Sequence, residues 1–447
     1  MCAGPKRRPR AGSGVVAVRA ALVAGAAAFG FVGAPCFAQP LFQGLGDLPG
    51  GLTRSFARAI SADGSTVVGE SSSAKSGLSE SASEAFRWTE SGGMAGLGDL
   101  GGGIFHSVAY ATSGDGSAVV GFGSTDTASA EGFHWDTGGM VAIGNMGAPP
   151  FLGTYSIALG ITPDGSQVCG SSSYYDPGPP EVYGFYAIRY VPSTGIMTPV
   201  GTLGSFGTRI AYAISPDGLY LTGLHDSNAA LWPPGGGVVG LGDLPGGADS
   251  SIGWAISGAG PVVVGGSSSD NSGFFGNEAF RWTGPCGMVA LGDLPDPPFG
   301  SFAHGVSNDG QVVVGIADAG AFGGTTPHAF IWNPRDGMRF LQTVLTDLGL
   351  GPSLEGWTLI SAAGVTPDGR TIAGYGFRPS GYEAFRARVP AYCRADCTAD
   401  GSLSVADFGC FQGRYVLGHM YADCNEDCAL TVADFGCFQG RYVLGCP

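Results

Sequence analysis

Hydrophobic and polar residues alternate along two short segments that recur together through most of the chain. Residues 84–100 read EAFRWTESGGMAGLGDL, and residues 278–294 read EAFRWTGPCGMVALGDL. In an extended strand, Phe86 and Trp88 would lie on one side and small or charged residues on the other. Weaker copies begin at Gly132 and at His328. The pattern predicts two strands joined by a glycine turn, in a repeat architecture.

A second motif precedes the first, and it occurs seven times. Each copy has an alternating apolar run, a turn and a Val-rich run, as in ARAISADGSTVVG at 57–69. This order predicts a β-hairpin with an Asp-Gly turn. The seven turns are centred on Asp63, Asp115, Asp164, Asp217, Ala259, Asp309 and Asp368. Two hairpins per repeat give four strands, so we predict an all-β domain over residues 39–390, a seven-bladed β-propeller.

The two ends of the repeat region predict that the ring closes. The seventh copy has a third strand at EAFRARV, from Glu383, but no LGDL segment follows it. An unpaired GLGDLPGG instead stands near the beginning, at Gly44. We expect this N-terminal segment to complete the seventh blade, because that pairing would remove the open edge of the sheet.

The repeated motif residues have structural explanations. We expect the motif aromatics to pack between neighbouring sheets; they are Phe86, Trp88, Phe280, Trp282, Phe330 and Trp332. The turn aspartates are expected to accept hydrogen bonds from their own backbone. Each turn offers one carboxylate, so we do not expect calcium there.

The loops between the second and third strands vary from copy to copy, in contrast to the short repeated turns. Function is often carried by variable loops on a rigid scaffold. Aromatic residues in these loops would stack on a sugar or anchor a peptide, or else fold back as loop plugs. The candidate ligand-contacting residues are Tyr174, Tyr175, Tyr183, Phe274 and Phe275.

Composition and the N-terminal segment limit the possible class of protein and indicate its cellular compartment. Charged residues make up 13% of the chain and the net charge is −15, which is the wrong sign for a nucleic-acid-binding protein. Residues 1–38 have a basic start, an apolar run and a Cys-Phe-Ala end, which predicts a secretory signal peptide and no membrane span in the mature chain. Cys169 and Cys286 stand alone in the repeat region, and we expect them to be small core or loop residues.

The last part of the chain, residues 391–447, predicts a second domain. VADFGCFQGRYVLG occurs at 405–418 and again at 432–445, each time after an acidic loop. Oxygen-bearing side chains fall at loop positions 1, 3, 5, 9 and 12, the spacing of an EF-hand calcium loop. The expected calcium ligands are Asp396, Thr398, Asp400, the carbonyl of Ser402, Ser404 and Asp407, then Asp423, Asn425, Asp427, the carbonyl of Ala429, Thr431 and Asp434. Two solvated acidic turns are the alternative.

A helix is expected after each loop but not before it. Pro390 is too close to the first loop, and the segment between the two units is too short. Phe408, Phe411 and Tyr415, with their counterparts in the second copy, share one helix face and would pack the two units together.

The repeat region resembles the extracellular HAF repeat family, on the basis of His328-Ala329-Phe330 and of the Gly-Met, LGDL and VVG segments. This resemblance extends over most of residues 41–388. It implies a secreted β-repeat protein, at the cell surface or outside the cell, and does not imply one reaction.

The duplicated loop–helix units look like a cysteine-containing dockerin. The resemblance implies calcium binding and docking to a cohesin-like or other surface receptor. It also implies that loop positions 10 and 11 contribute to partner choice; these are Val405, Ala406, Val432 and Ala433. Position 6 is Gly401 in the first loop but Cys428 in the second, although the sharp turn there favours glycine. We expect the pairs Cys397–Cys410, Cys424–Cys437 and Cys393–Cys446, with Cys428 left over.

Two functions follow from these features. The first is a secreted, non-enzymatic binding or scaffold protein that docks through its tail and presents the propeller to a glycan or protein. The second is a polysaccharide-active enzyme, a glycoside hydrolase or lyase, of a cellulosome-like assembly. Most acidic residues of the repeat region stand at repeated positions, and no catalytic residues are assigned, so we favour binding.

Overall fold

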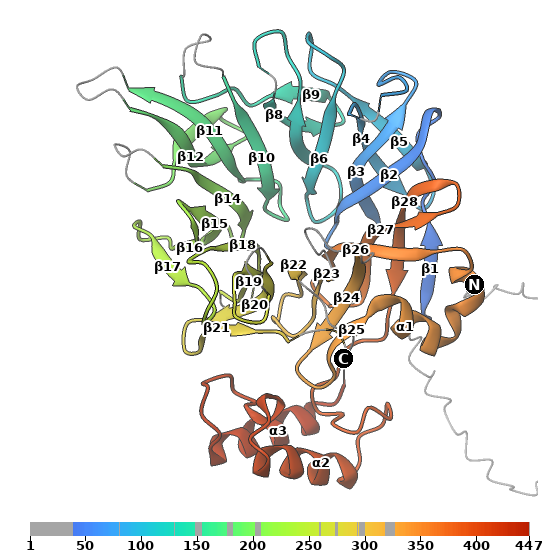
Figure 1. Cartoon of the computed structure of the whole chain (residues 1–447), viewed down its shortest axis with the longest axis vertical. Helices are drawn as coiled ribbons and strands as arrows, with labels where there is room; N and C mark the ends of the chain where they lie inside the picture. Colours follow the sequence, from blue (N-terminus) through green and yellow to red (C-terminus); the bar gives the residue numbers. More distant parts are fainter. Residues whose placement is uncertain are drawn as a thin grey trace, which may run out of the picture. The chain divides into compact units, whose positions relative to one another are not determined.

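The computed structural model describes residues 39–79, 81–128, 130–147, 154–176, 182–201, 207–258, 261–272, 276–292, 294, 300–317 and 327–446. The expected signal peptide, the turn at Ala259, and Phe274 and Phe275 lie outside this part of the chain. Within residues 39–446 the fold is mostly β, as the alternating pattern predicts (Figure 1).

Five sheets have four antiparallel strands each, and the strands pair in chain order. They are β6 (Ser107–Thr112), β7 (Val119–Gly123), β8 (Glu131–Asp136) and β9 (Gly139–Ala142); β10 (Ser156–Ile161), β11 (Val168–Asp176), β12 (Val182–Val191) and β13 (Ile196–Pro199); β14 (Arg209–Ile214), β15 (Leu221–His225), β16 (Asn228–Trp232) and β17 (Val239–Gly242); β18 (Ser251–Ile256), β19 (Val263–Ser267), β20 (Glu278–Thr283) and β21 (Gly287–Ala290); and β22 (Ser301–Val306), β23 (Val313–Ala317), β24 (His328–Asn333) and β25 (Gly337–Phe340). Each four-stranded sheet is one copy of the two sequence motifs.

The sixth sheet has eight strands and contains both ends of the repeat region. One group is β2 (Gly50–Ile60), β3 (Thr66–Ser73), β4 (Glu84–Thr89) and β5 (Gly93–Gly98); the other is β26 (Thr358–Val365), β27 (Thr371–Arg378), β28 (Gly381–Arg388) and β1 (Leu41–Gly44). A single parallel pairing, Arg54 with Tyr382, joins the groups. β1 pairs antiparallel with β28, and the Leu45 N–H donates to the Ala384 carbonyl (2.9 Å). The predicted pairing of the N-terminal segment with the last copy is therefore confirmed.

The first strands of the sheets follow one another around a common centre. β2, β6, β10, β14, β18, β22 and β26 are each packed against the next, and β26 also contacts β2. Small residues allow this close approach: a Cβ on Gly305 would lie 3.2 Å from the Gly364 Cα. Figure 1 shows the sheets arranged in this order, from blue through green to orange.

The predicted roles of the turn aspartates and motif aromatics are confirmed. Asp63 accepts a hydrogen bond from the Ser65 N–H (2.9 Å), and five further turn aspartates accept the same bond. Phe86, Phe280 and Phe330 are fully buried. The clusters of Phe280 and Phe330 include residues of the preceding sheet, and the cluster of Phe86 includes Ala373 and Ala384 from the other group of the eight-stranded sheet. The aromatic rows therefore hold neighbouring sheets together.

A helical segment between β25 and β26 is not predicted by the repeat. It consists of α1 (Leu341–Leu345) and two short turns, η2 (Thr346–Leu350) and η3 (Gly351–Leu354). Leu341 and Leu345 are fully buried, in one cluster with Phe42 and Trp357. This insertion therefore covers the place where the N-terminal strand joins the last sheet.

The C-terminal units fold as predicted, with a helix after each acidic loop. The helices are α2 (Val405–Val416) and α3 (Val432–Leu444), with a short turn, η4 (Met420–Ala422), between them. Ser404 and Thr431 cap the two helices, each in a capping box with an Asp three residues later. The Phe411 and Phe438 rings stack at 4.2 Å, so the predicted aromatic face packs the pair. Among the described residues, no helix is long and apolar enough to cross a membrane.

Candidate functional site

The first acidic loop is wrapped around two buried carboxylates. Asp407 accepts the N–H groups of Thr398 (3.0 Å) and Ser404 (2.8 Å). Asp396 accepts those of Asp400 (3.2 Å) and Gly401 (3.0 Å). Burial acts to raise the pKa of Asp407, but these hydrogen bonds hold it below its usual range. Loop positions 1 and 12 are thus fixed, while positions 3 and 5 are exposed.

The second loop repeats this arrangement, but one of its buried carboxylates, Asp423, has a raised pKa. Asp434 accepts the N–H groups of Cys424 (2.8 Å) and Thr431 (2.8 Å), and Asp423 accepts that of Cys428 (2.9 Å). Burial raises the pKa of Asp423, and the charges of Asp434 and Asp427 raise it further. A cation in the second loop would relieve this repulsion between carboxylates.

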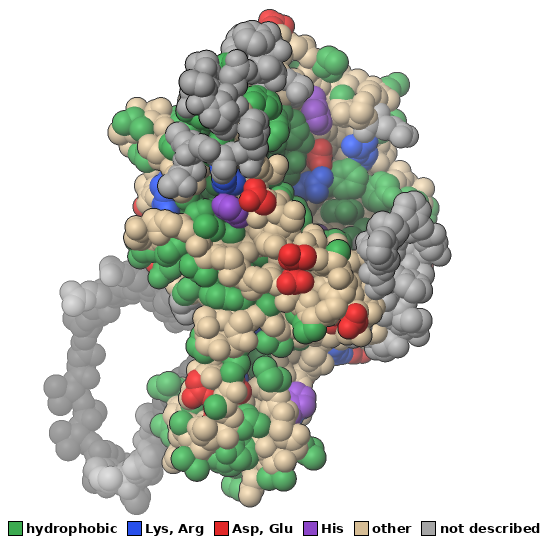
Figure 2. Space-filling model, turned by 60° about the vertical axis from the view of Figure 1, so that its left-hand side comes forward, with side chains coloured by type: hydrophobic (Ala, Val, Ile, Leu, Met, Phe, Trp, Pro, Cys, Tyr) green, Lys and Arg blue, Asp and Glu red, His purple; other side chains and the backbone are tan. Residues whose placement is uncertain are grey.

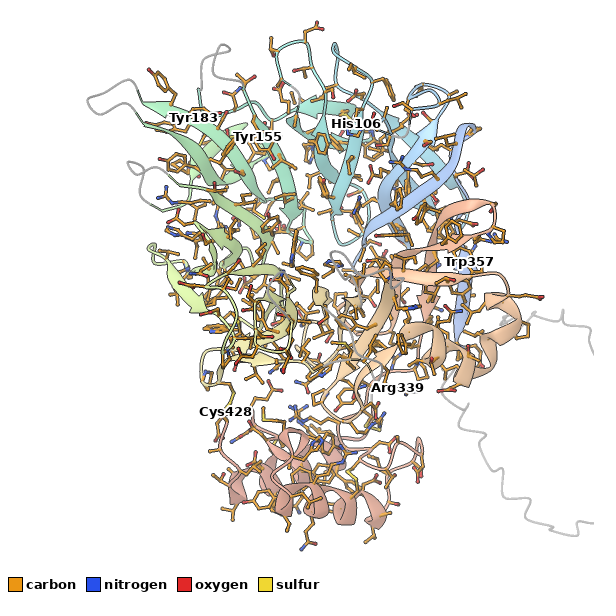
Figure 3. All side chains as sticks on the ribbon, viewed as in Figure 1. His106, Tyr155, Tyr183, Arg339, Trp357 and Cys428 are labelled. Atoms are coloured by element: carbon orange, nitrogen blue, oxygen red, sulfur yellow. A yellow bond between two sulfur atoms is a disulfide. The ribbon has the colours of Figure 1, made fainter. Side chains whose placement is uncertain are left out.

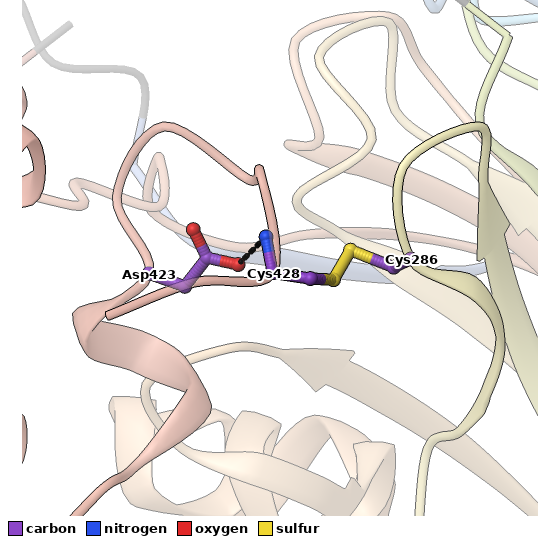
Figure 4. A group of neighbouring side chains, drawn as sticks. All are labelled: Cys286, Asp423 and Cys428. Atoms are coloured by element: carbon purple, nitrogen blue, oxygen red, sulfur yellow. Dashed lines mark hydrogen bonds between the residues drawn. A yellow bond between two sulfur atoms is a disulfide. The ribbon is translucent and has the colours of Figure 1, made fainter. Parts of the chain in front are cut away.

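The donor set of both loops suits a hard cation, because carboxylate, hydroxyl and carbonyl oxygens are the ligands of calcium. The carboxylates at present accept backbone N–H groups. In the part of the chain that the structure describes, one trio of possible ligand side chains lies within 4.8 Å, namely Cys286, Asp423 and Cys428. Its two sulfurs are joined in a disulfide (Figure 4), so this trio is not a metal site.

Four disulfides are present, and one of them corrects the sequence analysis. Cys393–Cys446, Cys397–Cys410 and Cys424–Cys437 are the pairs that were expected. The prediction that Cys428 is left over and that Cys286 is a small core or loop residue is wrong, because these two are bonded across 142 residues. Cys428 occupies loop position 6 with a positive φ of 65°. Cys169 is buried and free, as expected for a core residue.

The Cys286–Cys428 disulfide attaches the second loop to the repeat region, and charged residues add to this attachment. The Glu426 carboxylate, at loop position 4, pairs with Arg281 of β20 and with Arg394 (2.8 Å), and it accepts a hydrogen bond from Gln311. Burial acts to raise the pKa of Glu426, but the two guanidinium groups hold it below its usual range. The first loop has a smaller contact, from Arg335 Nη1 to the Asp396 carbonyl (2.7 Å).

The predicted partner-binding residues lie on the surface of the C-terminal module. Val405 is 83% exposed and Val432 is 84% exposed, and Ala406 and Ala433 are exposed beside them. The sequence analysis missed four further exposed residues at matching positions of the two helices, namely Val416, Leu417, Val443 and Leu444. Figure 2 shows hydrophobic side chains over the outer surface of this module. The repeated VLG at each helix end is the signal that would have found them.

The loop tyrosines are not placed as predicted. Tyr174, Tyr175 and Tyr183 belong to β11 and β12, which are nine and ten residues long and continue past the length of their counterparts. The three side chains are half-buried. Tyr174 packs edge-on against Tyr186 (5.3 Å), and Tyr183 lies 6.0 Å from Phe185. Figure 3 labels Tyr183 near the beginning of β12, at the end of the strand that lies away from the C-terminal module.

A cavity of about 440 Å³ lies between the first strands of the sheets, and the sequence analysis missed it. All seven first strands have a shift of the pairing register at a corresponding residue, which forms a β-bulge, and β2 and β26 each have one further shift. The seven bulge residues are Arg58, Tyr110, Leu159, Tyr212, Trp254, His304 and Ala363, and all of them line the cavity. In the sequence, this is the variable position between two small residues of the hairpin motif.

No protein-family model matches the chain, and no curated protein does. Solved structures with a similar fold include TolB from Acinetobacter baumannii (13% identity, 74% of this chain, 54% of that chain, TM-score 0.29). Another is an oligogalacturonate lyase in complex with manganese (12% identity, 79% of this chain, 97% of that chain, TM-score 0.46). A third is dipeptidyl peptidase 4 from Porphyromonas gingivalis (10% identity, 72% of this chain, 51% of that chain, TM-score 0.38). The chain spans about half the length of the TolB and peptidase chains.

Proposed function

We propose that the protein is a secreted binding protein, in which a seven-bladed β-propeller of HAF-type repeats carries a calcium-dependent docking module. The eight-stranded sheet would supply two blades, since its two groups of four strands meet at a single pairing. The five other sheets would supply one blade each.

The observation that carries the docking proposal is the twofold repetition of an exposed apolar surface beside an acidic loop. Val405, Val416 and Leu417 of one unit correspond to Val432, Val443 and Leu444 of the other, and all are exposed. Aliphatic side chains at this exposure are not needed for the core, which Phe411 and Phe438 fill. Paired exposed apolar residues are typical of a protein interaction site. A dockerin-like module would present them to a cohesin-like receptor.

Calcium would order the loops on which this surface depends. The ligands would be Asp396, Thr398, Asp400, the Ser402 carbonyl, Ser404 and Asp407 in the first loop, and Asp423, Asn425, Asp427, the Ala429 carbonyl, Thr431 and Asp434 in the second. Asp407 and Asp434 each lie in the first turn of a helix that begins with an exposed valine. Neutralising the carboxylates with a cation would therefore fix the helix ends that present Val405 and Val432.

The polysaccharide-active alternative has less support from the geometry. Hydrolysis of a glycoside uses two carboxylates. The described lining of the central cavity has no carboxylate, and Glu70, which is outside this lining, pairs with Arg58 and accepts a hydrogen bond from Ser83 (2.9 Å). Binding is the function that this arrangement supports better.

The docking proposal is tested with a panel of cohesin-type domains immobilised on a surface, over which the full-length protein is passed with calcium and then with chelator. We expect at least one domain to retain the protein in calcium only. A double variant, Val405→Arg with Val432→Arg, should lose at least tenfold in affinity, because each places a charge in an apolar contact. The matched control is Leu78→Arg, an exposed residue of the repeat region. Retention that persists in chelator, or that the double variant leaves unchanged, would contradict the proposal.

A further inference from the structure

The central cavity has the composition of a binding site. Its rim is built from one bulge residue per first strand, so the fold places seven side chains around one space without any contribution from the outer loops. A bulge re-aims a side chain and is a feature that proteins retain near functional sites. The volume, about 440 Å³, lies within the usual range of small-ligand sites.

One wall of the cavity is a continuous aromatic surface. The ring centroids of Tyr212 and Trp254 are 4.3 Å apart, and those of Trp254 and His304 are 6.0 Å apart with the rings nearly perpendicular. Such a wall offers flat apolar faces on which the C–H groups of a ring-shaped ligand pack.

The cavity lining also carries two buried hydrogen-bond donors that lack acceptors. The indole nitrogen of Trp254 is buried, and it has no hydrogen-bond partner among the described residues. The Nε of Arg58 is also buried and has no hydrogen-bond partner among the described residues. Burial raises the pKa values of Tyr110, Tyr155, Tyr212 and Tyr375, so their hydroxyl groups remain protonated donors. A buried donor without a partner is costly, and a ligand rich in oxygen acceptors would remove that cost.

The charges of the cavity cancel. Arg58 is the one lysine or arginine of the described lining, and Glu70 neutralises it in an ion pair. His304 is neutral near pH 7, since burial lowers its pKa to about 4. A charged ligand would enter a half-buried space with no free counter-charge, which is unfavourable.

The hairpin turns that follow the first strands are joined to one another through their backbone. The hairpin turns are hydrogen-bonded to one another around the centre: the Asp63 N–H donates to the Gly114 carbonyl (3.1 Å), and the Gly114 N–H donates to the Pro163 carbonyl (2.8 Å). The Gly258 and Asn308 turns continue the series in the other half. None of these turn residues is in the described lining of the cavity, which contains the bulge residues instead.

We propose that the central cavity binds a small uncharged saccharide, with Tyr212 and Trp254 as its stacking wall and the Trp254 indole N–H as a donor to a sugar oxygen. This inference deepens the proposed function, because it names the ligand class that the propeller would take. It does not require the C-terminal module or calcium.

The test is calorimetric titration of the full-length protein, in chelator, with galactose, lactose, maltose and cellobiose, and with glucuronate and indole as comparison probes. We expect one of the neutral sugars to bind at a single site with a millimolar or lower dissociation constant. Trp254→Phe keeps an aromatic ring, although a smaller one, and removes the indole N–H, so it should weaken binding roughly three- to tenfold. Ala363→Trp, which fills the cavity from β26, should abolish binding.

The matched control is Trp282→Phe on β20 of the same sheet, which is outside the cavity lining and should leave binding unchanged. Thermal unfolding of each variant shows whether it is folded. If Ala363→Trp does not fold, the sugar titration of Trp254→Phe decides the test. Absence of heat with all four sugars at millimolar concentrations would overturn the proposal, as would unchanged binding by Trp254→Phe. Tighter binding of glucuronate or indole would overturn the ligand class. Calcium-dependent docking is unaffected by any of these results, so the two proposals fail separately.

Discussion

The two acidic loops of the C-terminal module are followed by identical sequences, but they are attached to the rest of the protein differently. The first loop has Gly401 at position 6 and is contacted by Arg335, which donates to the Asp396 carbonyl and lies 3.8 Å from the Asp396 carboxylate. The second has Cys428 there, bonded to Cys286, and Glu426 paired with two arginines. Duplication produced two loops of one design, and the second also serves as the attachment point. A comparison of loop variants therefore separates metal binding from attachment.

The largest effect is expected from removing the disulfide between the module and the repeat region. Cys286→Ala opens a covalent loop of 142 residues, which the chain-entropy estimate values at about 4–5 kcal/mol. Thermal unfolding should change from one transition to two, with the module unfolding first. Cys169→Ala, which removes a thiol that is not cross-linked, is the control. A single unshifted transition in Cys286→Ala would contradict the role of the second loop as the attachment point.

A smaller loss is expected from Glu426→Gln. This change leaves the buried guanidinium of Arg394 without its carboxylate, at a cost of about 2–3 kcal/mol. Urea denaturation measures the loss, and Glu355→Gln, at an exposed site, should change stability by less than about 0.5 kcal/mol.

The same carboxylate predicts a pH dependence. The pKa of Glu426 in the folded protein is lower than its ordinary value of 4.5. Its contribution to stability is therefore complete above pH 4.5 and is lost as the pH falls through the lowered value. The difference in stability between the native protein and Glu426→Gln should shrink below that pH. A difference that stays constant down to pH 3 would show that the ion pairs are not its source.

Loop position 6 provides a test of backbone strain. In the Cys286→Ala background, Cys428→Gly should be more stable than Cys428→Ser by about 1–2 kcal/mol, because φ is positive there. Gly401→Ala should cost a similar amount in the first loop, where φ is 78°. Equal stability of the glycine and serine variants would mean that the second loop changes conformation once the disulfide is removed.

The smallest effect should be equal in the two units. Ser404→Ala and Thr431→Ala each remove a helix N-cap, and each should cost about 1 kcal/mol in urea denaturation. A clear inequality would show that attachment of the second loop also changes the stability of its helix.

Much of the fold could be predicted because it is repeated. Asp-Gly turns, alternating strands and the position of LGDL each follow from local chemistry, and the displaced copy at Gly44 indicates how the ends pair. Features that occur once were missed. The helical segment from Leu341 has no counterpart in other copies. The Cys286–Cys428 bond joins residues that no sequence spacing relates, because only the folded sheets bring them together.

The central cavity was missed for a different reason. The residues at the bulge position differ in chemistry, from Arg58 to Ala363, so no copy resembles a site by itself. They form one surface only when seven first strands lie around one centre. The tyrosines of β11 and β12 were misplaced because the hairpin continues as paired strand where other copies turn.

Calorimetric titration of calcium into the full-length protein tests the central claim most directly. We predict uptake at two sites in the native protein, with one site lost in Asp407→Asn and the other in Asp434→Asn. Cys286→Ala should weaken calcium binding by the second loop, which is the site that remains in Asp407→Asn. It should leave the first loop, which is the site that remains in Asp434→Asn, unchanged. No heat at millimolar calcium, or an equal effect of Cys286→Ala on both sites, would contradict the account.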